Sequence, residues 1–98
     1  GGYLDCIAMA RLGEEAGAIS VPHNWGSRAG GCMGVQAAMA VKSIVAAEDD
    51  RSTSDVLRAD GYVFRGGCYT PPEEPGAGLR VEEPAYRAKC SPVEVIIQ

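Results

Sequence analysis

The strongest constraint on the fold is a pair of short apolar runs on either side of an apolar helical segment. Residues 18–21 lie between a glycine and a proline and are too few for a helix, so we expect a buried strand there. Residues 32–41 are apolar on almost every side, apart from Gln36, which is typical of a helix covered on two faces. A second apolar run, 43–47, ends at an acidic cluster. Together these segments have the size of one βαβ unit with a parallel strand pair.

A further helix is predicted before this unit, over residues 3–16. Met9, Leu12 and Ala16 share one face of that helix, and Gly17 follows at the position where a left-handed glycine commonly ends a helix. Parallel strands with continuous apolar runs need cover on both faces, and one βαβ unit with one more helix cannot provide it. We therefore expect an α/β fold that is a slice of a larger structure.

The second half of the chain is more irregular. A turn leading into a strand is predicted over residues 60–65, followed by a turn at Gly66-Gly67. A loop rich in proline and glycine covers residues 71–78, and short strands are expected at 79–81 and 93–96.

Charge and composition exclude several classes of function. The 98 residues carry a net charge of −4 without a basic stripe, which disfavours nucleic-acid binding through phosphates. No apolar run approaches the roughly 18 residues that a membrane span needs. The chain starts at Gly1-Gly2 with neither an initiator methionine nor a signal peptide, and we expect it to be a fragment.

The four cysteines are far apart, and none belongs to a C-x-x-C pair. Because the sequence has a single histidine, this spacing disfavours a zinc site. Cys6 and Cys32 lie inside apolar helical patterns, where a free cysteine behaves as a small buried hydrophobe. That placement favours reduced cysteines in a cytoplasmic protein, and two disulfides in a secreted chain are the alternative.

His23 and Glu48 are the candidate catalytic residues. Each follows a predicted parallel strand, and sites in α/β proteins are built at the carboxyl ends of the strands. Neighbouring strands lie about 4.8 Å apart, so both side chains can face one pocket. The imidazole of His23 can then act as a general acid or base. The alternative for His23 is a packed histidine bonded to a backbone carbonyl.

Three nearby residues carry weaker signals. Trp25, the single tryptophan, either lines a substrate pocket or packs against neighbours. Asp49 and Asp50 are expected to form a solvated acidic turn beside Glu48.

The run Pro22-His23-Asn24-Trp25-Gly26-Ser27 resembles the end of the seventh barrel strand in the mandelate racemase subgroup of the enolase superfamily. Three further segments agree with this resemblance, which covers roughly residues 1–89. Gly1-Gly2 and the following helix resemble the exit of the sixth strand, and Glu48-Asp49-Asp50 resembles the acidic end of the eighth. Asp60-Gly61-Tyr62 and Pro75-Gly76-Ala77-Gly78-Leu79 resemble the segment that returns to the capping domain.

The resemblance implies a modified (β/α)₇β barrel with a capping domain, and the loss of a proton α to a carboxylate. Residues 1–58 would be the last part of the barrel, and residues 59–98 a segment packing on barrel and cap. His23 would be the general base or acid, and Glu48 would hydrogen-bond a carboxylate oxygen of the substrate. Asn24 and Trp25 would contact a small carboxylate or acid-sugar substrate.

Much of the implied machinery lies outside these residues. The resemblance places the aspartate that partners the histidine, and the Mg²⁺ ligands, upstream of Gly1. It also implies a homo-oligomeric parent, either a sugar-acid dehydratase or a racemase, and the isolated chain is expected to be inactive. The alternative from another class is a small noncatalytic α/β module that binds a partner through residues 32–41.

Overall fold

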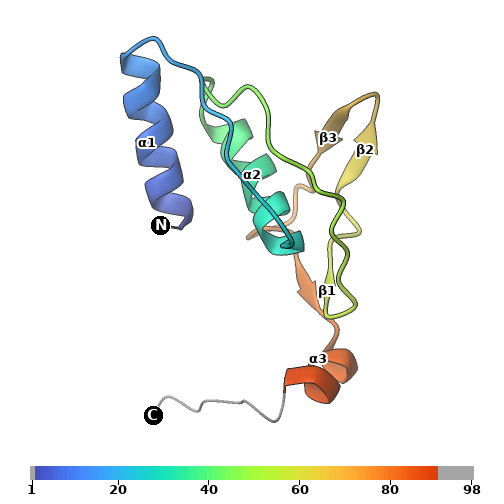
Figure 1. The fold of residues 1–98 in the computed structure, drawn as a ribbon. Helices are drawn as coiled ribbons and strands as arrows, with labels where there is room; N and C mark the ends of the chain where they lie inside the picture. The colour runs from blue at the N-terminus through green and yellow to red at the C-terminus, as the bar shows by residue number, and fades with distance from the viewer. Residues whose placement is uncertain (1, 91–98) are drawn as a thin grey trace.

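Two helices of equal length form the first half of the protein, whose computed structural model describes residues 2–90. Helix α1 spans Tyr3–Glu15 and α2 spans Arg28–Ala40. They lie side by side with their chains running in the same direction (Figure 1). Gly17 follows α1 with a φ of 72°, in the left-handed region that glycine adopts readily, so the predicted helix and its glycine end are confirmed. The apolar face on which the prediction rested is exposed, since Met9 and Leu12 face solvent and Ala10 lies in the core.

Helix α2 begins four residues earlier than its apolar pattern predicts. Ser27 is its N-cap, and the Ser27 hydroxyl oxygen accepts a hydrogen bond from the Gly30 amide at 3.0 Å. This bond satisfies one of the amide groups that a helix leaves free in its first turn. The apolar pattern missed this first turn because glycines have low helix propensity, which capping and packing outweigh here, whereas residues 23–27 form an irregular loop.

The two predicted parallel strands are reduced to one bridge between Ser20 and Ile44. The Ser20 amide donates to the Ser43 carbonyl at 2.7 Å, and the Val45 amide donates to the Ser20 carbonyl at 3.3 Å. The parallel pairing is thus present at the predicted place. It aligns the two segments in the same direction, so their carboxyl ends lie together.

The prediction that residues 18–21 form a buried strand was wrong. Ile19 is 71% exposed and Val21 is 55% exposed, and Val45 on the neighbouring segment is 59% exposed. Apolar composition shows that a segment gains from burial, but burial also requires a covering layer. Within residues 2–90 this pair of segments has such a layer on one side only.

Helix α2 lies between two small apolar clusters. The first cluster joins it to α1 and to the segment after it, and consists of Ala10, Ala37, Val41 and Ile44. The second cluster joins it to the C-terminal half, and consists of Cys32, Ala59 and Tyr62. The predicted two-sided cover of this helix is therefore present.

Buried polar groups at both clusters are hydrogen-bonded. The Ser43 hydroxyl, which is buried, donates to the Ala10 carbonyl at 2.8 Å. The Tyr62 hydroxyl donates to the Ala77 carbonyl at 2.6 Å and accepts from the Gln36 amide at 3.1 Å. Pairing of this kind removes the cost of burying a polar atom, and the Tyr62 bonds fix the C-terminal loop against α2.

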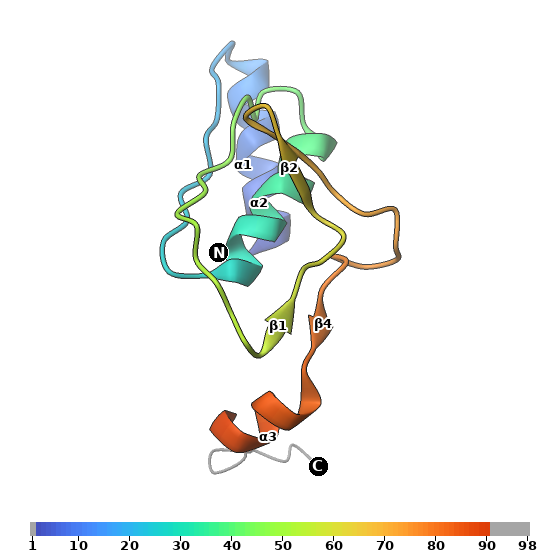
Figure 2. The same cartoon turned by 90° about the vertical axis from the view of Figure 1, so that its right-hand side faces the viewer.

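Four short strands follow in the C-terminal half, of which Figure 2 shows β1 beside β4 and Figure 1 shows β2 beside β3. Strand β1, Leu57–Arg58, pairs antiparallel with β4, Arg80–Val81. Strands β2, Val63–Arg65, and β3, Cys68–Thr70, form a hairpin. Its turn residues Gly66 and Gly67 both have positive φ, as a two-residue hairpin turn of this kind requires. The strands predicted within 60–65 and 79–81 are confirmed, whereas β1 and β3 were not predicted.

Helix α3, Glu83–Cys90, was also not predicted. It has no buried residue and no apolar stripe, and an ion pair of 2.6 Å joins Glu83 to Arg87 one turn later. The strand predicted at residues 93–96 lies outside the described residues. The fold is thus a mixed α/β arrangement of three helices and short antiparallel strands, with one parallel contact within residues 2–90.

Candidate active site

The candidate site lies where the two parallel segments end. The Glu48 amide donates to the Pro22 carbonyl at 3.4 Å, which extends the parallel pairing to the residue before His23. His23 and Glu48 therefore leave their segments at the same edge. The Nδ1 atom of His23 lies 2.6 Å from Oε2 of Glu48. The two side chains thus lie in contact, but the prediction that both face one pocket is not met, because His23 lines one cavity and Glu48 lines another.

Glu48 holds the imidazole and the backbone beside it. Its Oε2 atom also accepts a hydrogen bond of 2.7 Å from the Asn24 amide. The His23 side chain is 80% exposed, so this carboxylate contact is what orients the ring. A partner on Nδ1 fixes which nitrogen carries the proton and leaves Nε2 for proton transfer. The pair can act chemically as an oriented acid or base.

Asp50 holds the next turn of the same loop. Its Oδ2 atom accepts a hydrogen bond from the Gly26 amide, and Oδ1 lies 3.5 Å from the side-chain amide of Asn24. The Ser52 amide donates to Oδ1 at 3.1 Å. The bond from Gly26 is the largest cause that holds the pKa of Asp50 below the ordinary value of an aspartate. The prediction of a solvated acidic turn therefore missed these contacts of Asp50 with the loop.

Asp49 points to the other side of the chain. It accepts a hydrogen bond of 2.9 Å from the Tyr69 hydroxyl and forms an ion pair of 3.2 Å with Nε of Arg51. Successive side chains of an extended segment face opposite sides, and the three consecutive acids follow this rule. Glu48 and Asp50 bind the loop that carries His23, whereas Asp49 binds the C-terminal half. For Asp49, too, the prediction of a solvated turn missed the contacts that its side chain makes.

Asn24 and Trp25 are placed differently. Asn24 is half-buried and its polar groups bind Glu48 and Asp50, so it positions the loop. Trp25 is 77% exposed. The role of both residues in substrate binding stays a prediction.

A cavity of about 430 Å³ opens beside His23, between the first turns of α1 and α2. Its lining includes Tyr3, Cys6 and Met33 together with Pro22 and His23. Sequence reasoning did not single out the first three of these. Their positions in the sequence could have indicated them, because the first turn of a helix that follows a strand lies at the same edge as the carboxyl end of that strand.

Comparison with known proteins gives one finding. Residues 1–85 match the family whose description is enolase C-terminal domain-like. The chain belongs to this family. No curated protein and no solved structure gives a significant match. Membership confirms the expected relation to the enolase superfamily, while the mandelate racemase-like subgroup stays a prediction.

Residues 2–90 have neither a cluster of metal ligands nor a membrane-spanning helix. No group of three or more histidine, cysteine or acidic side chains in that range is placed to hold a metal ion. The residues described therefore do not fit the Mg²⁺ site that the family resemblance implies. None of the helices in the same range has the length and apolar character needed to cross a bilayer. The four cysteines are free thiols.

Acid should release the loop that Asp50 holds. A lowered pKa in the folded state means that the carboxylate stabilises the fold above the ordinary pKa of aspartate. That contribution is lost as the pH falls through the lowered value. Because Trp25 is the single tryptophan and lies in this loop, its fluorescence should change in a transition below the ordinary aspartate pKa.

The Asp50→Asn substitution should remove this acid transition from the fluorescence of Trp25. Asp60→Asn is the matched control, because Asp60 binds Arg58 at the surface, away from the loop. An unchanged transition in Asp50→Asn would show that another carboxyl controls the loop.

Proposed function

We propose that His23 and Glu48 are the proton-transfer pair of an enzyme that acts at the carbon α to a carboxylate. The observation that carries this proposal is the 2.6 Å contact between Nδ1 of His23 and Oε2 of Glu48, at the shared carboxyl end of two parallel segments. Membership in the enolase C-terminal domain-like family supports it, since active sites of barrel enzymes lie at this end.

The proposed reaction begins with the bond between the α carbon and its hydrogen. Nε2 of His23 takes the proton, and the electron pair moves into the carboxylate to give an enediolate. The carboxylate of Glu48 stabilises the imidazolium that forms and keeps the ring in place. In a dehydratase, the imidazolium instead gives a proton to the departing β-hydroxyl, which leaves as water. In a racemase, a base outside the described residues takes the α-proton on one face, and the imidazolium of His23 gives a proton to the opposite face of the α carbon.

The cavity beside His23 is the proposed substrate site. Its volume of about 430 Å³ lies in the range of small-molecule sites, and suits a small carboxylate or acid sugar. The first turns of α1 and α2 would form its walls. The side of the substrate that faces away from these helices would meet residues outside the described range.

We propose that further chain completes the site. A closed barrel takes about 250 residues, and two of its strand ends are described here. The Mg²⁺ ion implied by the family resemblance would be held by acidic residues outside the described range, and no step above depends on its geometry. On this proposal, the 98-residue chain alone is inactive.

The structure weakens the alternative of a noncatalytic module that binds a partner through residues 32–41. The apolar side of that segment is already used, because α2 packs on α1 and on the C-terminal half at the same time. Packing within the described residues therefore explains most of the apolarity that suggested a docking helix, although Met33 and Met39 stay exposed.

Proton exchange in D₂O tests the proposed function. The natural protein that contains these residues is incubated with Mg²⁺ and a panel of 2-hydroxy carboxylates and acid sugars, and the α-proton signal is followed by NMR. We expect loss of that signal for at least one substrate, and none with the isolated 98-residue chain. Exchange by the isolated chain would contradict the proposal that further chain is required. No exchange across the panel by the folded natural protein would contradict the proposed reaction.

A further inference from the structure

A second cavity, of about 390 Å³, lies on the side of the acidic segment that faces away from His23. Three arginines line it, namely Arg28, Arg51 and Arg58, together with the hydroxyl-bearing run 52–54 and the rings of Phe64 and Tyr69. Two neighbouring acids contact opposite sides of the chain. Asp49 binds Tyr69 and Arg51 on the side of this cavity. Glu48 binds His23 on the side of the candidate active site. Neither His23 nor Glu48 lines this cavity, although Arg28 also borders a small cavity of about 20 Å³ that Glu48 and Asp49 line.

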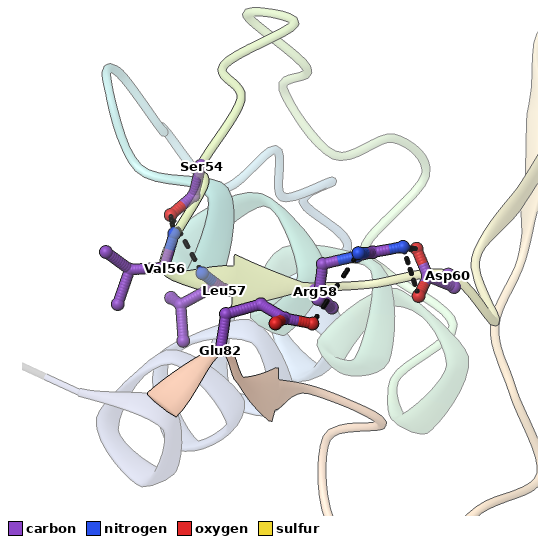
Figure 3. A network of polar contacts seen from close by, with 6 residues as sticks. All are labelled: Ser54, Val56, Leu57, Arg58, Asp60 and Glu82. Carbon is purple, nitrogen blue, oxygen red and sulfur yellow. Dashed lines mark hydrogen bonds and ion pairs between the residues drawn. The ribbon is translucent and has the colours of Figure 1, made fainter. Parts of the chain in front are cut away.

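The three guanidinium groups differ in how far acidic groups neutralise them. Arg58 donates to Asp60 at 3.1 and 3.2 Å and lies 3.5 Å from Glu82 (Figure 3). Its charge is therefore compensated. Ser54 also uses its hydroxyl oxygen locally, because it accepts from the amides of Val56 and Leu57 (Figure 3).

The guanidinium group of Arg51 is held by two contacts that leave some of its N–H donors free. Its Nε atom pairs with Asp49, and its guanidinium carbon lies 4.1 Å from the centre of the Phe64 ring. Stacking on an aromatic ring and a single carboxylate contact hold the guanidinium plane without using all of its donors. Such a group is already ordered for a ligand, so little side-chain freedom is lost on binding.

Arg28 carries the uncompensated charge. Among residues 2–90 its side chain has no hydrogen-bond or ion-pair partner, although the residue is half-buried. It is also the first residue of α2, where the helix dipole places partial positive charge. A cation at that end of a helix is unfavourable, and an anion bound there would be attracted by both the guanidinium and the helix end.

We propose that this cavity binds a small oxyanion, a carboxylate or a phosphate, between the guanidinium groups of Arg28 and Arg51. Both groups supply planar pairs of N–H donors, which match the oxygens of such anions. The hydroxyl of Thr53, which lines the same cavity, is an additional donor. Binding at this site does not depend on the reaction proposed for His23.

Calorimetric titration of the protein with inorganic phosphate, and separately with acetate, tests this site. We expect saturable binding of at least one of the two, weakened by added chloride because the attraction is electrostatic. Phosphate binding alone would identify a phosphate-bearing ligand, and acetate binding alone would identify a free carboxylate. The absence of saturable binding for both would overturn the proposal.

Substitution of single arginines tests whether the anion binds in this cavity. Arg28→Gln should weaken binding by at least about tenfold, as expected for the loss of charged hydrogen bonds. Arg11→Gln is the matched control, since it removes the same charge from an exposed position of α1 and should leave binding unchanged. Equal weakening in both variants would show a general charge effect and overturn the site. If Arg28→Gln does not fold, Arg51→Gln gives the same test from the other side of the cavity.

Discussion

Replacement of His23 by asparagine should lower the rate of α-proton exchange by about 10²–10⁴-fold. The introduced side-chain amide would keep a hydrogen-bond donor near Glu48, but it has no nitrogen that accepts and releases a proton near neutral pH. The side chain of His23 is 80% exposed, so its loss removes little buried surface. Deuterium exchange by NMR in the natural protein measures the rate, and circular dichroism checks that the fold is kept.

The Glu48→Gln variant separates orientation from proton transfer. Glutamine has the same shape but no charge, so the imidazolium loses its stabilising partner and the amide of Asn24 loses a charged acceptor. We expect a smaller loss of exchange than in His23→Asn. Glu14→Gln on the exposed side of α1 is the matched control and should be silent. Normal exchange in His23→Asn would remove His23 from the mechanism, whatever the result for Glu48.

Replacement of Ile44 by alanine should reduce the free energy of unfolding by about 2–4 kcal/mol. Ile44 is 4% exposed and belongs to the cluster that joins α1, α2 and the segment after α2. Truncation leaves a cavity among small neighbours such as Ala10 and Ala37, which cannot fill it. The midpoint and slope of the urea unfolding transition of the 98-residue chain measure the change.

The same substitution at Ile19 provides the control. Ile19 is 71% exposed, so Ile19→Ala should change the free energy of unfolding of the 98-residue chain by no more than about 0.5 kcal/mol. An equal loss in the two variants would mean that Ile19 is covered in solution. A negligible loss in Ile44→Ala would contradict the packing of the first cluster.

Sequence pattern predicted those elements whose signal is local. The helix over residues 3–16 was found because its apolar residues repeat at helical spacing and Gly17 ends it. The start of α2 was missed because glycines suggested a loop, whereas the decisive group is the Ser27 hydroxyl. Helix α3 was missed because it has no apolar stripe, and charged side chains at i and i+4 give a weak signal.

The burial of residues 18–21 was predicted wrongly for a different reason. Whether Ile19 and Val21 are covered depends on which other segments lie nearby, and these residues alone do not determine that. The contact between the two candidate side chains was predicted better than the strands that lead to it. The proximity of His23 to Glu48 follows from parallel chain direction alone, which a single bridge at Ser20 is enough to set.

The contacts of the acidic residues 48–50 were predicted only in part, because Asp49 and Asp50 were expected to behave alike. The alternation of side chains along an extended segment separates Asp49 from Glu48 and Asp50, and that rule was available from the sequence. The contacts of Asp50 with Gly26 and Asn24 required the path of the loop, which sequence pattern does not give.

Helix α2 is common to both apolar clusters, and its position makes unfolding cooperative. Each cluster is too small to stay packed without the helix. Ala37 and Val41 are part of the first cluster, and Cys32 is part of the second. Loss of the helix would release both halves together, and loss of either half would expose one side of the helix. The two halves are thus thermodynamically linked through a single element, so their amide protons should exchange with solvent in one concerted opening.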